Sequence, residues 1–174
     1  MTHSDNDPYV ALARKTISEY ITTGKKISVP DGLPEEMLTG QAGAFVSLHR
    51  HDSLRGCIGT ILPTTDCIAE EIIQNAVSAS TRDPRFQPVR EDELDDLDIS
   101  VDVLCKPEVI DSPDKLDVRR YGVIVTKGFR RGLLLPDLDG VDTVEEQINI
   151  AKMKAGIDPD EDVKLERFEV IRHH

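Results

Sequence analysis

Cysteine, arginine and glycine come together in the heptapeptide LRGCIGT at residues 54–60. Cys57 is a nucleophile by residue type, and a neighbouring Arg55 would favour its thiolate form. The arginine has a second possible use, because a guanidinium can hold a carboxylate or phosphate through two parallel hydrogen bonds. Gly56 and Gly59 are unusual in a strand, where glycine often marks the close approach of another backbone or a ligand. The stretch therefore predicts a shallow pocket around Cys57.

The strand that contains this heptapeptide is expected to pair with the strand before it. Residues 43–48 and 54–62 are both strand-like, and a short polar segment joins them. The apolar residues of both strands must share one face, or the sheet would bury the wrong side. A three-residue loop over residues 51–53 satisfies that condition.

This register predicts which polar side chains share the opposite face. Ser47 would lie opposite Cys57, and His49 would lie opposite Arg55. Cross-strand neighbours have Cβ atoms about 5 Å apart. A thiol, an imidazole, a hydroxyl and a guanidinium would then form one patch, in which His49 is the candidate base.

A second polar segment, TRDPRF at residues 81–86, is a candidate loop over the same pocket. Its arginines would supply cations to a bound anion. The catalytic candidates are Cys57 and His49. The ligand-binding candidates are Ser47, Arg55, Gly56, Ile58, Gly59, Thr60, Arg82, Asp83 and Arg85.

Each of these residues also has an ordinary structural interpretation. Cysteine is often a small buried apolar residue. The two glycines would permit a bulge or close helix packing. Arg55 would pair with one of the 33 acidic residues, and Asp83 would cap a local turn. The residues alone leave both interpretations open.

Composition narrows the class of protein. The chain has 174 residues, which suits one domain over residues 1–174, and a net charge of −12. That charge argues against nucleic-acid and anionic-membrane partners, and no apolar run is long enough to span a bilayer. Three widely spaced cysteines match neither a disulfide framework nor a zinc motif. We expect a cytoplasmic protein with no metal and no nucleotide-type cofactor motif.

Local signals predict an α+β fold with a largely antiparallel sheet and helices packed on it. Asp7-Pro8 and Gly24 bound a first helix, and Thr143 and Gly156 bound the last. Another helix follows the polar residues 64–66. Strands are expected over residues 43–48, 54–62, 98–104, 121–127, 130–135 and 163–171.

The hairpin with its following helix occurs twice. GAFVSLHRHDSLRGCIGTILP resembles GVIVTKGFRRGLLLP: each second strand contains Arg-Gly and ends in Leu-Pro, and a capped helix follows. We interpret this as an internal duplication of a strand–helix unit.

These motifs together resemble the AMMECR-one-like domain family, the A protein of the AmmeMemoRadiSam system. The resemblance rests on LRGCIG (54–59), DPRF (83–86), ISVDVL (99–104), RRGLLLP (130–136) and KAGI (154–157). It implies an α+β fold with duplicated units and no established activity. It also implies association with a Memo-like protein and a radical SAM protein. Many members have Trp-containing segments near the C-terminus, which this chain lacks.

Two functions follow as expectations. In the first, a cleft around LRGCIGT binds or modifies a small anionic or peptide ligand. In the second, the same face is a non-catalytic adaptor surface for a protein partner. His173 and His174 resemble the remnant of a purification tag and support neither function. The oligomeric state is open.

Overall fold

Capping residues begin and end the first and last helices as their sequence predicts, whereas Cys67 precedes the helix Ile68–Thr81 without a side-chain capping hydrogen bond. In the computed structural model, which describes residues 6–174, helix α1 spans Pro8–Thr23. The Asp7 carboxylate accepts hydrogen bonds from the backbone N–H groups of Tyr9 and Val10, and Gly24 ends the helix at a φ of 76°. Helix α4 spans Val144–Ala155, and the Thr143 hydroxyl caps it by accepting from the Glu146 N–H and donating to the Glu146 carboxylate. Gly156 ends it in the left-handed conformation.

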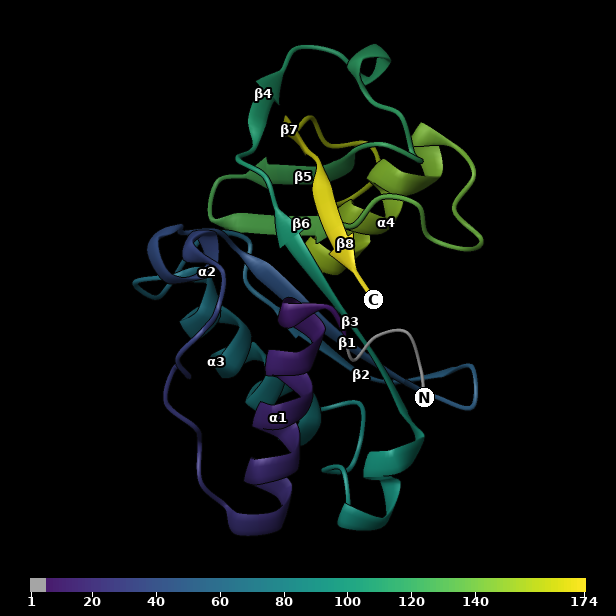
Figure 1. Cartoon of the computed structure of the whole chain (residues 1–174). Helices are drawn as coiled ribbons and strands as arrows, with labels where there is room; N and C mark the ends of the chain where they lie inside the picture. The colour runs from purple at the N-terminus through teal and green to yellow at the C-terminus, as the bar shows by residue number, and fades with distance from the viewer. Residues whose placement is uncertain (1–5) are drawn as a thin grey trace. The chain divides into compact units, whose positions relative to one another are not determined.

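The chain divides into two compact units (Figure 1). One comprises the chain up to residue 104 together with residues 171–174, and the other comprises residues 105–170. Each unit contains its own four-stranded sheet, so the fold is α+β with two antiparallel sheets where one was expected. The single-domain assignment stays a prediction.

The first unit packs its helices on the sheet β2-β1-β3-β8. Figure 1 shows α1 and α3 lying against this sheet. The core is aliphatic, with Val46, Leu48, Ile72, Ile99 and Val101 fully or almost fully buried. The elements besides α1 are α2 (Glu35–Thr39), β1 (Ala44–Arg50), β2 (Ser53–Gly59), α3 (Ile68–Thr81), the 3-10 helix η2 (Glu91–Asp96), β3 (Leu97–Leu104) and β8 (Val170–His173).

The second unit packs α4 on the sheet β4-β7-β5-β6. Val123 and Val125 of β5 and Ala151 of α4 lie at the centre of its smaller core. The other elements are β4 (Glu108–Ile110), the 3-10 helix η3 (Pro113–Lys115), β5 (Gly122–Lys127), β6 (Arg130–Leu134) and β7 (Lys164–Phe168). The last expected strand, over residues 163–171, is therefore two strands, β7 and β8, in different sheets.

The predicted duplication is confirmed by matching contacts. A buried amide on each helix donates to the carbonyl at the start of its hairpin: Asn75 to Ala44 in the first unit and Gln147 to Tyr121 in the second, both at 2.8 Å. Each unit then adds a third strand after its helix, giving β1-β2-α3-β3 and β5-β6-α4-β7. The fourth strand is exchanged, because β8 follows β7 along the chain but pairs with β3, and β4 follows β3 but pairs with β7.

The C-terminal strand β8 is anchored by side chains of the first unit. His173 stacks on Tyr9 with 3.8 Å between ring centroids, and its Nδ1 lies 2.8 Å from the Asp7 carboxylate. Arg172 donates to the buried Asp102 at 2.8 Å. His173 is therefore a packed residue of this sheet, although its sequence position suggested a tag remnant. No helix among the described residues is long and apolar enough to cross a membrane.

Candidate functional site

The hairpin that contains Cys57 differs from its expected register at the turn. The loop has two residues, His51 and Asp52, both at positive φ (51° and 64°), as in a type I′ turn. Ser47 lies opposite Cys57 as predicted. His49, however, pairs with Leu54 and not with Arg55, so the expected four-residue patch does not form.

Arg55 is the extra residue of a β-bulge. Leu48 pairs with Gly56 and His49 pairs with Leu54, which leaves Arg55 without a partner in β1. Its guanidinium instead forms a bidentate ion pair with the buried Glu93, at 2.8 and 3.1 Å.

Two backbone carbonyls complete the surroundings of Arg55. The guanidinium also donates to the carbonyls of Gln87 and Pro88. The Arg55 hydrogen bond lowers the pKa of Glu93 to about 2. Arg55 therefore links β2 to the segment before η2, and its donors are engaged within the protein.

The two glycines of the motif leave no open hollow. A Cβ on Gly56 would lie 2.3 Å from the carbonyl oxygen of Ala79 on α3, so this glycine allows the helix to approach. A Cβ on Gly59 would overlap the ring of Phe45, its cross-strand partner. Ile58 packs against the first unit's core. The expectation of a pocket formed by missing side chains is wrong at both glycines.

Cys57 has a neutral thiol in a half-buried setting. Its Sγ lies 3.2 Å from the Ser47 Oγ, within hydrogen-bonding distance. Burial raises the pKa of the Cys57 thiol, although the Ser47 hydrogen bond and the charge of Arg85 act in the opposite direction. The lowered pKa expected from a neighbouring Arg55 is therefore wrong. No hydrogen bond joins His49 to Cys57 among the described residues, so the pair lacks the contact that a nucleophile and its base require.

Asp83 and Arg85 hold the backbone of Cys57. The Asp83 carboxylate, in a residue only 4% exposed, accepts from the Cys57 N–H at 3.0 Å. Arg85 Nη2 donates to the Cys57 carbonyl at 3.3 Å and to Asp83 at 2.7 Å. The Arg85 hydrogen bond holds the pKa of Asp83 well below its usual range. We call Asp83 and Arg85 the edge clip, because β2 is the edge strand of its sheet.

The edge clip gives the DPRF segment a role that its sequence only partly predicts. The proximity of Asp83 and Arg85 to Cys57 was expected, whereas their hold on the backbone of the strand was not. Asp83 lies 26 residues after Cys57 and accepts a hydrogen bond from a single backbone amide. A contact between residues so far apart in the sequence leaves no local sequence pattern that would reveal it. Arg85 keeps a side chain 55% exposed beside the thiol. Arg82 is exposed at the C-terminal end of α3.

Thr60 belongs to a buried carboxylate network that the sequence does not reveal. Its hydroxyl donates to Glu71 at 2.6 Å, and Asn75 donates to the Thr60 oxygen at 3.2 Å. Glu71 also accepts from the backbone and hydroxyl groups of Thr64 and Thr65. These hydrogen bonds lower the pKa of Glu71 against the effect of its burial. Thr60 thus fixes the end of β2 to α3.

The geometry therefore separates most of the predicted candidates into two groups, and His49 and Arg82 belong to neither. Arg55, Gly56, Ile58, Gly59 and Thr60 all have structural partners in the first unit. A smaller group surrounds the thiol, and we call it the Cys57 face: Ser47, Cys57, Asp83 and Arg85. Among residues 6–174, no group of three histidine, cysteine or acidic side chains is arranged to hold a metal ion.

The structure is therefore an α+β protein with two matching hairpin–helix units. Its edge strand β2 contains a cysteine whose backbone is hydrogen-bonded by Asp83 and Arg85. The AMMECR1 family model matches residues 10–173, and the chain belongs to that family. A Thermotoga maritima protein is 55% identical over 168 residues, covering 95% of this chain and 97% of its own length.

Other relatives extend the comparison. A Clostridium acetobutylicum protein is 55% identical over 170 residues and covers 97% of this chain, which spans only 36% of that relative. The crystal structure of an uncharacterized protein from Pyrococcus horikoshii matches with a TM-score of 0.87 at 39% identity, over 94% of this chain and 88% of that one. These relatives establish the family and the fold of this chain. The biochemical role of the family is not established.

Proposed function

We propose that the Cys57 face is a binding site for a carboxylate-bearing ligand, either a small anion or an acidic peptide segment. The observation that supports this proposal is the half-exposed Arg85 guanidinium, held beside a neutral thiol by a buried carboxylate. Arg82 adds a second exposed cation nearby in sequence. In an otherwise acidic chain, an exposed arginine beside a polar thiol, with a second exposed arginine three residues before it in sequence, favours an anionic ligand.

The neutral thiol favours binding over nucleophilic chemistry. Burial raises the pKa of Cys57, and Arg55 and His49 make no contact that would activate it. Cys57 then contributes a weak hydrogen-bonding group and a rigid backbone rather than a thiolate. The same observation favours an adaptor role as the second candidate, in which the Cys57 face contacts an acidic segment of a protein partner.

The partners proposed for this site are a Memo-like protein and a radical SAM protein. They follow from the family resemblance, and an acidic segment on either protein would match the Arg82 and Arg85 cations. The binding site would then lie on the edge strand β2, where the edge clip fixes the position of the cysteine.

Calorimetric titration with the Memo-like and radical SAM proteins of the same organism tests this proposal. Arg82→Gln should weaken binding a few-fold, since an exposed ion pair contributes up to about 1 kcal/mol. Lys15→Gln, which removes an exposed cation from α1, is the matched control and should have no effect. Cys57→Ser should retain most of the affinity, because a hydroxyl replaces the neutral thiol.

Mass spectrometry of the purified protein extends the test to small ligands. Carboxylates retained by the wild type and lost from Arg82→Gln would support a small-anion site. The proposal fails if neither protein binds and no carboxylate is retained. It also fails if Cys57→Ser alone abolishes a chemical turnover, which would identify a nucleophile.

A further inference from the structure

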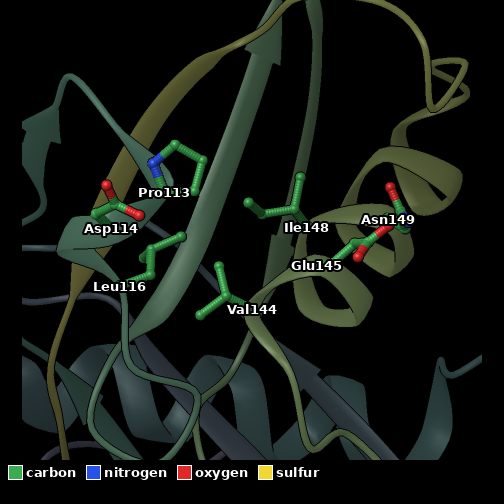
Figure 2. Close-up of a pocket in the computed structure, with 7 residues that line it drawn as sticks. All are labelled: Pro113, Asp114, Leu116, Val144, Glu145, Ile148 and Asn149. Atoms are coloured by element: carbon green, nitrogen blue, oxygen red, sulfur yellow. The ribbon is translucent and has the colours of Figure 1, made fainter.

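A hollow beside α4 in the second unit offers no cation to an acidic ligand. It has a volume of about 500 Å³, and Figure 2 shows Leu116 on one side of it and Val144 and Ile148 of α4 on the other. Asp114 and Glu145 also line it, and none of its lining residues in the described chain is a lysine or an arginine. The hollow therefore does not suit the carboxylate-bearing ligand of the proposed function, whose recognition we expect at the exposed arginines beside β2.

The edge of β2 at Cys57 is covered by side chains alone. The Asp83 carboxylate accepts from the Cys57 N–H at 3.0 Å, and Arg85 donates to the Cys57 carbonyl at 3.3 Å. In the described chain, no hydrogen bond between two backbone groups joins residues 82–88 to β2. Residues of an antiparallel strand point their backbone groups alternately towards and away from the neighbouring strand, so Gly59, like Cys57, points its N–H and C=O away from β1. The stretch from Cys57 to Gly59 is therefore a strand edge on which the side chains of the edge clip protect Cys57.

The edge clip is a turn that is held together mainly by its own hydrogen bonds. The Asp83 carboxylate accepts from the Arg85 N–H at 3.1 Å, from the Arg85 Nε at 3.0 Å and from the Arg85 Nη2 at 2.7 Å. Two further hydrogen bonds, both to Cys57, join this pair to β2. Because the carboxylate and the guanidinium neutralise each other, the clip can leave the strand without leaving either charge unpaired. A backbone that supplied the same two hydrogen bonds to Cys57 could take its place.

Positive charge at this edge is available to a ligand. The Arg85 side chain is 55% exposed, and in the described chain no hydrogen bond uses its Nη1 group. Arg82 is exposed three residues before it. Asp102, whose charge also acts on the Cys57 thiol, is paired with Arg172 at 2.8 Å. The carboxylates near Cys57 are thus neutralised within the protein, and the exposed arginines favour an acidic partner over a basic one.

We propose that an extended acidic segment of a partner protein pairs with β2 and displaces the edge clip at Cys57. A backbone C=O of the segment would accept from the Cys57 N–H in place of Asp83, and an N–H of the segment would donate to the Cys57 carbonyl in place of Arg85. Gly59 would bond the segment two residues further along, and a glutamate or aspartate of the segment would bind Arg85. This inference rests on the proposed function, because both use the Arg85 cation.

The cover nearer the hairpin turn sets the length of the pairing. Arg55 donates to the carbonyls of Gln87 and Pro88, and Glu93 holds the Arg55 guanidinium at 2.8 Å. These bonds involve residues that follow the clip, so they remain when the clip alone turns away. The bulge at Arg55 also interrupts the regular alternation of the strand. The segment would therefore pair with residues 57–59 and end before the bulge.

Two labelled peptides separate strand pairing from charge attraction in a fluorescence anisotropy titration. Both alternate glutamate with threonine and have the same length and charge, but the second has a methyl group on every backbone nitrogen and cannot donate to β2. The wild type should bind the first peptide about tenfold more tightly, because the second loses its backbone hydrogen bonds to the strand. In amide hydrogen exchange, the first peptide should slow the exchange of the Gly59 N–H severalfold, because that group gains a partner.

Asp83→Asn tests the displacement of the edge clip. The amide binds Arg85 more weakly than the carboxylate does, so this variant should bind the unmethylated peptide a few-fold more tightly than Asp52→Asn. Asp52→Asn changes the net charge equally at the exposed hairpin turn, where asparagine tolerates the positive φ. Circular dichroism verifies both folds, and the comparison of the two peptides on the wild type decides the proposal if Asp83→Asn does not fold.

Several outcomes would overturn the strand pairing. These are equal affinity of the wild type for the two peptides, an unchanged exchange rate at Gly59, and equal affinity of folded Asp83→Asn and Asp52→Asn for the unmethylated peptide. Dimerisation of the wild type in sedimentation without peptide would identify a second copy as the added strand and would also overturn it. Glutarate, a dicarboxylate without a peptide backbone, reports on the proposed function separately. If glutarate binds the wild type and the peptides do not pair, the carboxylate site stands and the strand pairing fails.

Discussion

Replacement of Gly56 by alanine directly tests why a strand contains glycine next to Arg55. A Cβ at this position would lie 2.3 Å from the carbonyl oxygen of Ala79 and 3.6 Å from Leu48 Cδ1. The near contact is with helix backbone, so α3 must move away by about 1 Å to restore an ordinary contact distance. The backbone at Gly56 does not have positive φ, so the cost comes from packing alone.

The expected net loss of stability is about 1 kcal/mol. Overpacking of a core costs about 1–3 kcal/mol, and the alanine recovers about 0.5–1 kcal/mol of backbone entropy. For a chain of this size each kcal/mol shifts Tm by about 2–4 °C, so Gly56→Ala should melt about 2–4 °C below the wild type. Thermal melting by circular dichroism, with urea denaturation alongside, measures the difference.

Two further variants make this measurement specific. Gly132→Ala should destabilise similarly, because its Cβ would lie 2.1 Å from the carbonyl oxygen of Ala151 in the second hairpin–helix unit. Ser53→Ala, at an exposed position of the same strand as Gly56, should stay within about 0.5 kcal/mol of the wild type. A Gly56→Ala protein that melts at or above the wild type would refute the packing explanation and return Gly56 to the list of binding candidates.

Three other experiments examine the site. Iodoacetamide should modify the exposed Cys105 before the half-buried Cys57, as peptide mapping would show, and the Cys57 rate should still rise above pH ~8.5. Arg55→Met should cost about 3 kcal/mol in urea denaturation, since it leaves the Glu93 carboxylate buried without its cation. The pKa values of Glu93 and Asp83 are both lowered by folding, so their stabilising effect should be complete above about pH 4.5 and decline as the pH falls towards 2. Urea midpoints unchanged between pH 6 and pH 3 would contradict that assignment.

Local capping chemistry made the helices predictable from the sequence. Asp7 and Thr143 accept hydrogen bonds from the first helical N–H groups, and Gly24 and Gly156 take the left-handed conformation that ends a helix. These signals involve residues at most four positions apart, so no tertiary information is needed to identify them. The duplicated Arg-Gly hairpins were visible for the same reason.

The hairpin register required information that the sequence does not carry locally. A two-residue turn places His51 and Asp52 at positive φ, where residues other than glycine are uncommon. The sequence prediction used a three-residue loop because, without a bulge, that loop places the apolar residues of both strands on one face. The bulge at Arg55 compensates for the shorter turn, because it restores the inward position of Gly56 and keeps Ser47 opposite Cys57.

Long-range side-chain contacts were the least predictable part of the site. Glu93 lies 38 residues beyond Arg55, and Asp83 lies 26 residues beyond Cys57. A chain with 33 acidic residues offers many alternative partners for an arginine or an amide. Only the fold selects among them, by bringing the segment after α3 alongside the edge strand β2.

The second hairpin–helix unit supplies an internal control for the LRGCIGT motif. Gly132 repeats the close helix approach of Gly56, so that glycine belongs to the architecture of the repeat and not to a site. The bulge residue Arg55 has no counterpart in the second hairpin. In the first hairpin three residues separate the turn from Gly56, whereas in the second hairpin only two residues separate the turn from Gly132.

The same comparison isolates the residues that the repeat does not explain. Leu133 follows Gly132 where Cys57 follows Gly56, and Ile124 lies opposite Leu133 where Ser47 lies opposite Cys57. An apolar pair thus suffices for folding at this position of the repeat. The thiol–hydroxyl pair and its edge clip are additions to a hairpin that folds without them in the second unit, and for that reason they are the part of the motif to test for function.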